Sequence, residues 1–460
     1  MNKLTLATLM ATSVALIGCD DDDDNVAAIA ADTPQSSLQA VHASADAPRA
    51  NVWLNDAAAL TDVDYATASG FLPVNAGMNA VQVDVQLPGG NVTTVVPRTE
   101  LDFSADTNYT VMVVGNASGA NNPVEPLIVT RPATGSADSE TLDVQVVHAA
   151  SGVGDVNVYV TGPSATIADS APIATLGYKD FTDVVNVAEG SYRVRLETVD
   201  GSIIAFDSGT VDLAAGAELT VAAVINPDSS ESASPVKLMV MDGTNTTIIH
   251  DMSDPAEVRV GHLVDGAPAV DISLNGSPVD ALQGVPFKTV SGYLDLAAGD
   301  YDIDVFATGT TSSLIDVDGL SLAGGGDYSV FAVLTTASPL AIEPLVIADK
   351  RRSVATSAIL NVVHAAANPV AQSVDVYLTA NASIEGSDPA LSNFTYKSNV
   401  MGIYVADGDY FLTITVAGQP SVVAIDAIPV SFSDGVVYSA IAIDDASGSG
   451  FSVLLSDITD

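Results

Sequence analysis

Apolar and polar positions alternate along the chain in short runs, a pattern that predicts β-strands with one face in a core. Val, Thr, Ile and Tyr dominate these runs, and Gly, Asp, Asn and Pro separate them. Turn signals come about every 8–12 residues, and no helical periodicity is sustained, which is typical of antiparallel sandwiches. We therefore expect an all-β protein with few helices.

Four copies of one motif divide the chain into repeats. An apolar strand ends at a histidine in each copy, with separations of 106 (42 to 148), 114 (148 to 262) and 102 (262 to 364) residues. The four histidines are His42, His148, His262 and His364. A second strand motif follows each histidine at 10 or 12 residues, so the self-similarity predicts tandem domains of one architecture.

A glycine opens a later strand in every copy, and the residues four and six positions beyond it are apolar. The glycines are Gly77, Gly190, Gly299 and Gly408. Glycine at a strand start is the residue that permits a positive φ. A tyrosine stands two residues later in the last three copies, and Asn79 replaces it in the first. We expect this tyrosine to close the sandwich edge with its hydroxyl on a backbone group.

A third anchor and a final strand complete each repeat and set its limits. The third anchor begins at Tyr109, Leu219, Tyr328 and Tyr438. The polar segment Asn226–Pro235 aligns with an internal loop of the first copy, so we interpret it as a hairpin loop and not as a linker. The predicted repeats, each with about seven strands, span 38–132, 142–243, 257–352 and 359–460. They are expected as beads on a string, joined through Ala133–Thr141, Thr244–Ala256 and Ser353–Ala358.

The first residues have the pattern of an export signal, because Lys3 precedes an uncharged apolar stretch from Leu4 to Gly18. The stretch ends in Leu-Ile-Gly before Cys19, which resembles a bacterial lipobox and is the only cysteine of the chain. We therefore expect a signal peptide over 1–18 and lipidation of Cys19, which anchors the chain to a membrane. The acidic segment 19–37 is then a disordered tether.

The net charge of −43 excludes nucleic acid as a partner, because a phosphate backbone requires a basic surface. With its single cysteine used for the anchor, the chain has no disulfide or thiolate site. The acidity is interpreted as a solubility feature, with a cation-binding surface as the alternative. Location in the cell envelope follows from the anchor, with the outer membrane or cell surface favoured, although Asp20 is also compatible with the inner membrane.

At these motifs the sequence resembles the bacterial family catalogued as domain of unknown function 4397. The resemblance rests on the strand ending in His-Ala at His42, on the loop closed by Pro48, and on the Ala-Gly-x-Tyr turn at Tyr301. It covers nearly the whole mature chain and implies immunoglobulin-like sandwiches in envelope or secreted proteins. It implies no established activity.

The candidates for chemistry are few. One histidine per repeat without cysteine does not supply a metal site, so we expect the four histidines and the four glycines to be structural. Ser44 lies two residues from His42, yet the third repeat has no serine near His262, and a hydrolase elbow Gly-x-Ser-x-Gly is absent from the sequence. We expect no catalytic residue and no enzyme activity, and an extracellular hydrolase is the least favoured function.

Two charged clusters in the sequence lead to expectations about calcium binding and about ion pairing. Asp300, Asp302 and Asp304 share a strand face, but the twelve-residue calcium loop is incomplete, so no cofactor is expected beyond a weak case for structural calcium. The basic cluster 350–352 is expected to pair with the acidic body or a neighbouring repeat.

Two functions remain open from the sequence. The repeats are expected to form a binding or adhesion module for an envelope glycan or protein, since loops on rigid sandwiches are frequent recognition sites. The alternative is a passive structural spacer of the envelope.

Overall fold

The computed structural model describes residues 34–119, 121–135, 137–227, 233–335, 341–369, 372–445 and 450–460. The expected signal peptide, Cys19 and most of the acidic tether lie outside these residues. The all-β prediction is confirmed, because the described helical elements are the short 3-10 turns η1 (Pro88–Gly90) and η2 (Asp280–Leu282). No helix of the described part is long and apolar enough to cross a membrane.

Each repeat is a sandwich of two sheets, as expected. The strands of repeat 1 are β1 (Gln35–His42), β2 (Ala50–Leu54), β3 (Ala57–Val63), β4 (Thr67–Ala68), β5 (Leu72–Asn75), β6 (Gly77–Gln86), β7 (Val92–Phe103), β8 (Thr107–Val114) and β9 (Glu125–Pro132). Those of repeat 2 are β10 (Thr141–His148), β11 (Val156–Thr161), β12 (Ala174–Leu176), β13 (Val185–Ala188), β14 (Gly190–Thr198), β15 (Ile204–Leu213), β16 (Glu218–Ile225), β17 (Val236–Met241) and β18 (Thr246–Ile249).

Repeats 3 and 4 follow the same plan. The strands of repeat 3 are β19 (Ala256–His262), β20 (Val270–Leu274), β21 (Ser277–Pro278), β22 (Thr289–Val290), β23 (Leu294–Leu296), β24 (Gly299–Ala307), β25 (Ser313–Leu322), β26 (Asp327–Leu334) and β27 (Ile342–Ala348). Those of repeat 4 are β28 (Ala358–His364), β29 (Ser373–Thr379), β30 (Leu391–Thr395), β31 (Asn399–Val405), β32 (Gly408–Val416), β33 (Gln419–Phe432), β34 (Val437–Asp444) and β35 (Phe451–Asp457).

One sheet of each repeat contains the histidine strand and the other contains the glycine strand. In repeat 1 the orders are β4-β1-β8-β9, with β5 also on β1, and β3-β2-β6-β7. The prediction of a purely antiparallel sandwich is wrong at one place, because β1 pairs in parallel with β8. The same parallel pair recurs as β10·β16, β19·β26 and β28·β34.

Three details at the repeat limits differ from or add to the expectations. β1 begins at Gln35 and pairs with β5, so the end of the segment 19–37 is strand. The expected linker Thr244–Ala256 contains β18, which pairs with β17. Strands β16 and β17, which flank Asn226–Pro235, pair with each other, so this segment lies inside repeat 2 as expected, although its residues 228–232 lie outside the described residues.

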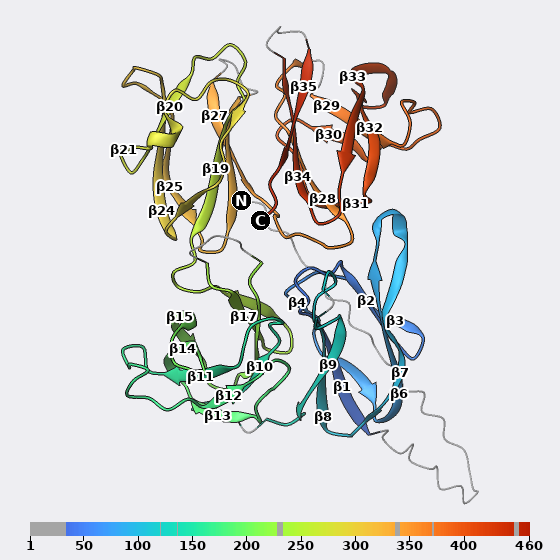
Figure 1. The fold of residues 1–460 in the computed structure, drawn as a ribbon, viewed down its shortest axis with the longest axis vertical. Coiled ribbons are helices and arrows are strands. Elements are labelled where there is room, and N and C mark those ends of the chain that lie inside the picture. The colour runs from blue at the N-terminus through green and yellow to red at the C-terminus, as the bar shows by residue number, and fades with distance from the viewer. Residues whose placement is uncertain are drawn as a thin grey trace, which may run out of the picture.

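The four sandwiches lie two by two (Figure 1). Repeats 1 and 2 lie side by side below, and repeats 3 and 4 lie side by side above. Repeat 1 also contacts repeat 4, since Arg49 lies over the Tyr404 ring, and the backbone N–H of Ala355, in the segment before repeat 4, donates to the carbonyl of Asp46 at 2.8 Å. The repeats are thus separate sandwiches, but they are not joined as a loose string of beads.

The outer faces of the histidine-strand sheets pack against each other within each pair of repeats. Met112 and Val114 of β8 lie in one apolar cluster with Ala222 and Val224 of β16. Phe331 and Val333 of β26 and Ile441 and Ile443 of β34 lie together in the same way. These strands are buried on both faces, which explains why their sequences are apolar runs with little alternation.

Candidate functional site

Each repeat histidine lies at the end of the first strand and is buried there. His42, His148 and His262 are at most 1% exposed. Their Nε2 atoms lie 2.9, 3.1 and 3.0 Å from the carbonyls of Pro48, Gly154 and Pro268, six residues further on in every case. The imidazole ring therefore ties the strand end to the loop that leads into the second strand.

An aromatic residue and a backbone hydrogen bond complete this corner in every repeat. The ring edge of Tyr65 faces His42 with centroids 6.1 Å apart, and Tyr178, Phe287 and Tyr396 occupy the same place in the other repeats. The following residue has a positive φ and donates its N–H to the histidine carbonyl at 2.7–2.9 Å. These residues are Ala66, Lys179, Lys288 and Lys397. This element was not among the sequence expectations. The recurring aromatic–lysine pairs are a sequence signal for it, but their distance from the histidine varies between repeats, which hides the repetition.

The three lysines of these corners connect partner repeats. Lys179 of repeat 2 bonds Glu125 of repeat 1 at 2.8 Å, and Lys288 of repeat 3 bonds Asp445 of repeat 4 at 3.2 Å. Lys397 of repeat 4 pairs with Glu343 of repeat 3. The histidine corners are therefore part of the joint between sandwiches.

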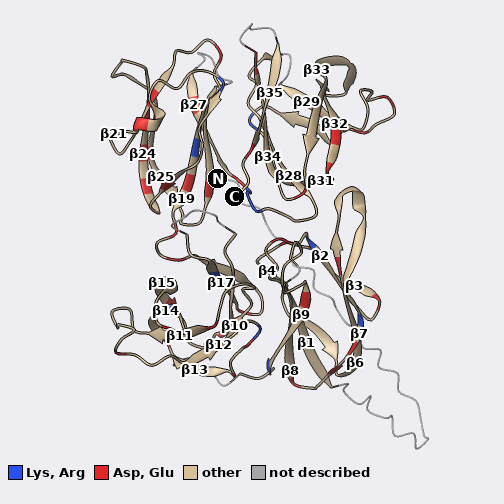
Figure 2. Ribbon diagram, viewed as in Figure 1, with Lys and Arg blue, Asp and Glu red and all other residues tan. Residues whose placement is uncertain are grey.

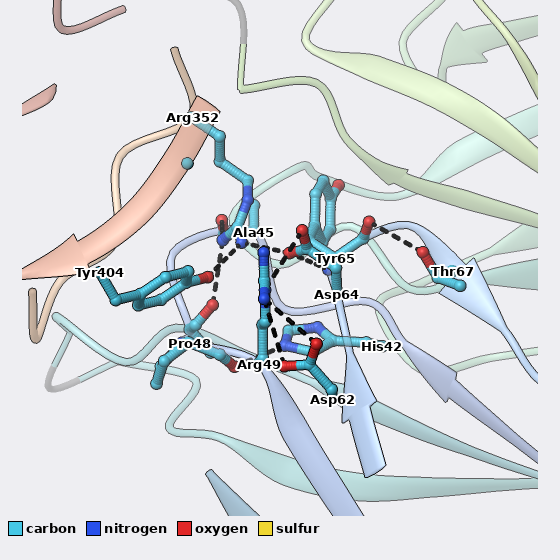
Figure 3. Close-up of polar contacts among 12 residues, drawn as sticks. His42, Ala45, Pro48, Arg49, Asp62, Asp64, Tyr65, Thr67, Arg352 and Tyr404 are labelled. Atoms are coloured by element: carbon cyan, nitrogen blue, oxygen red, sulfur yellow. Dashed lines mark hydrogen bonds and ion pairs between the residues drawn. The ribbon is translucent and has the colours of Figure 1, made fainter. Parts of the chain in front are cut away.

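The corner of repeat 1 also receives Arg352 from the segment before repeat 4 (Figure 3). One terminal nitrogen of Arg352 donates to the carbonyls of Ala45 and Ala47 at 2.9 and 3.0 Å, and the other contacts Asp64 at 2.7 Å. Arg49 lies over the Tyr404 ring, 5.2 Å from its centroid. The contacts of Arg352 and Arg49 together hold repeat 1 against repeat 4.

Arg351, the neighbouring residue, lies in a second buried cluster. Its guanidinium contacts Glu257 at 2.6 Å, Asp327 at 2.9 Å and Asp460 at 3.5 Å, and it lies 3.8 Å from the Tyr293 ring centroid. The prediction that the basic cluster pairs with neighbouring acidic groups is confirmed for Arg351 and Arg352. Basic residues are few among acidic ones spread over all four repeats (Figure 2).

The same three carboxylates are the one set in the described residues that lies close enough to hold a metal ion. Arg351 already supplies the positive charge there. Of the acidic face considered in the sequence, Asp302 accepts the backbone N–H of Gly319 at 2.9 Å, and Asp304 stands opposite another carboxylate, Asp316, in the β24–β25 pair.

Burial and backbone contacts define the electrostatics of the corners. Burial lowers the pKa of His42 to about 4, and it also lowers the pKa values of His148 and His262. These rings are neutral at pH 7, and Ser44 donates its hydroxyl to the Gly115 carbonyl at 2.8 Å. The geometry fits a fold-stabilising role, and the absence of chemistry at these histidines stays a prediction.

The glycine anchors have the backbone conformation that their residue type suggests. Their φ values are 106°, 150°, 154° and 139°, in chain order. The hydroxyls of Tyr192, Tyr301 and Tyr410 donate to the carbonyl four residues earlier at 2.9, 2.8 and 3.2 Å, as expected. In repeat 1 the Asn79 side chain makes the same bond to the Asn75 carbonyl at 2.8 Å. A polar corner bond is therefore kept in all four copies.

These features define a tandem β-sandwich protein with one histidine corner per repeat. Three segments, 36–159, 142–252 and 256–377, match the family described as Domain of unknown function (DUF4397), and together they cover more than half of the chain. The protein belongs to this family, as the sequence resemblance implied. No curated protein matches the chain.

Two solved structures show weak similarity at 10% sequence identity. The Bacillus anthracis TIE protein aligns over 86% of this chain and 66% of its own length with a TM-score of 0.16. The product complex of a multi-modular glycogen-degrading pneumococcal virulence factor, SpuA, aligns over 86% of this chain and 38% of its own length with a TM-score of 0.17. The chain thus spans less than two thirds of either relative.

Proposed function

We propose that this protein is a lipid-anchored binding or adhesion module of the cell envelope, without catalytic activity. The observation that carries the proposal is the two-by-two arrangement of the repeats. An extended chain of sandwiches gives a spacer its reach, whereas this arrangement folds four sandwiches into the length of two. It holds the loops of the four repeats at fixed relative positions, which favours multivalent recognition.

The joints between repeats support rigid presentation of these loops. Each pair of repeats shares an apolar cluster, and Arg352 contacts both Asp64 of the first repeat and Tyr404 of the last. Ordering the four sandwiches in advance lowers the entropy that a multivalent partner must offset on binding. The acidic surface disfavours anionic polymers and favours neutral or cationic envelope components.

Lipidation at Cys19 is tested by substitution and fractionation. The wild-type chain is expected in the membrane fraction, because acyl chains contribute about 0.8 kcal/mol per buried CH₂. Cys19→Ser is expected in the soluble exported fraction with an unchanged far-UV spectrum, since the folded repeats begin near Gln35. A Cys19→Ser chain that remains with membranes, or a mature N-terminus elsewhere by mass spectrometry, contradicts the anchor.

The binding proposal is tested with the soluble Cys19→Ser chain. It is screened against arrayed glycans and purified envelope proteins, with and without calcium, while small-angle scattering records its dimensions. We expect saturable binding that survives high salt and a scattering profile of a compact two-by-two particle. An extended profile together with a blank screen supports the spacer instead.

A further inference from the structure

Repeat 2 contains an apolar cavity of about 440 Å³ between its two sheets. The lining comes from both sheets, with Val146 and Val221 on one side and Val158 and Val211 on the other. The interior cavity of repeat 3 measures about 40 Å³ and that of repeat 4 about 230 Å³. Repeat 2 therefore has more space between its sheets than repeat 3 or repeat 4.

Two positions at one end of the sandwich distinguish repeat 2 from the other repeats. One position is the residue that pairs with the anchor glycine, near the end of the strand beside the glycine strand. The other position is the residue at which the third sequence anchor begins, and it lies in the facing sheet. The first position is Phe103, Leu213, Leu322 and Phe432, and the second is Tyr109, Leu219, Tyr328 and Tyr438, in repeat order. Repeat 2 alone has no aromatic ring at either position.

In repeats 1 and 4 the two rings contact each other at this end of the sandwich. Phe103 and Tyr109 stack with centroids 4.4 Å apart, and Phe432 and Tyr438 meet edge to face at 5.0 Å. The Tyr109 hydroxyl also accepts the Ser104 N–H at 2.9 Å. In repeat 2 both leucines line the cavity and leave this end open.

The cavity lining is apolar over most of its surface, and its few polar positions include two aspartates. Val, Leu, Ile and Ala form most of the lining, while Asp212, Asp242, Asn245 and Thr247 supply most of the polar groups. Backbone N–H groups of Asn245 and Thr244 lower the pKa of Asp242, which is therefore charged at pH 7. Water gains few hydrogen bonds in such an interior, and a carboxylate ligand is repelled by the acidic groups.

We propose that the cavity of repeat 2 binds one unbranched aliphatic chain with an uncharged head. A volume of about 440 Å³ holds on the order of a dozen CH₂ groups, if each takes about the 30 Å³ of a water molecule in the liquid. The hydroxyl of a long-chain alcohol can donate to an aspartate at the polar positions. This site goes beyond the proposed binding of envelope components and does not depend on it.

The test uses the Cys19→Ser chain and 1-dodecanol as the probe, measured by calorimetry, with dodecanoate for comparison. The wild-type cavity is expected to bind one dodecanol per chain, and dodecanoate at least ten-fold more weakly. In the variant Leu213→Phe/Leu219→Tyr, which introduces the rings of repeat 1, dodecanol binding is expected to fall at least ten-fold while the ligand-free melting temperature rises. The control Leu213→Met/Leu219→Met keeps similar volume without rings and is expected to bind as wild type does.

A second pair of variants covers the case in which the ring variant does not fold. Val211 lines the cavity from the edge strand β15, and its neighbour Thr210 is exposed. Val211→Phe is expected to reduce dodecanol binding at least ten-fold, and Thr210→Phe to leave it unchanged. The proposal is overturned if wild type does not bind dodecanol, if a folded cavity-filling variant binds it as wild type does, or if dodecanoate binds equally well.

Discussion

Replacing Arg351 by alanine is expected to destabilise the chain by about 3–5 kcal/mol, the cost typical of removing one partner from a buried ion pair. The substitution leaves Glu257, Asp327 and Asp460 facing one another without a cation. It also removes the guanidinium from the Tyr293 ring and from the Ile458 carbonyl, which it contacts at 3.0 Å. The free energy of unfolding, measured with urea at pH 7, checks this prediction.

Lys350→Ala is the matched control, because it removes the same charge from the preceding, exposed residue. It is expected to change stability by less than about 0.5 kcal/mol, as is usual for surface substitutions. Calcium provides an additional measurement, since three carboxylates without Arg351 form a set with metal-binding spacing. Calcium should raise the melting temperature of Arg351→Ala more than that of wild type. An Arg351→Ala chain as stable as the control contradicts the role assigned to this cluster.

Acidification from pH 7 to pH 4 is expected to remove about 3 kcal/mol of stability through His42 alone. Burial lowers the pKa of His42 to about 4 in the folded chain, whereas an unfolded histidine titrates near about 6.5. The unfolded state therefore binds more protons between these values. The stability from the neutral ring is complete above about pH 6.5 and is lost progressively as the pH falls toward about 4.

His148 and His262 shift in the same direction for the same reason, so they add to the loss. Carboxylates also titrate in this range, so the contribution of His42 is measured as the difference between wild type and the variant His42→Gln. Glutamine can donate to the Pro48 carbonyl but does not titrate. The stability of the His42→Gln chain should therefore fall by roughly 2 kcal/mol less than that of wild type between pH 7 and pH 5. Equal pH slopes for urea unfolding of wild type and His42→Gln would show that His42 titrates normally in the folded chain.

The sequence by itself determined the repeat architecture, because strand patterning and turn chemistry are local properties. The spacing of the four histidines, the glycines at strand starts and the tyrosine after them located the same corners that the structure contains. It also resolved Asn226–Pro235 as a loop inside repeat 2, since the flanking strands align with those of the other repeats. Each of these features depends on residues close together in one repeat.

Only the tertiary structure decided how the repeats are joined and where space remains between sheets. The apolar run around Met112 indicates a strand buried on both faces, but nothing local says that β16 and β17 of the next repeat cover it. Arg352 contacts Asp64, which lies 288 residues earlier in the chain. Leu213 and Leu219 are ordinary core residues in the sequence, and only the structure shows that both line one cavity. Such contacts between distant residues depend on packing geometry, which the local periodicity of a sequence does not encode.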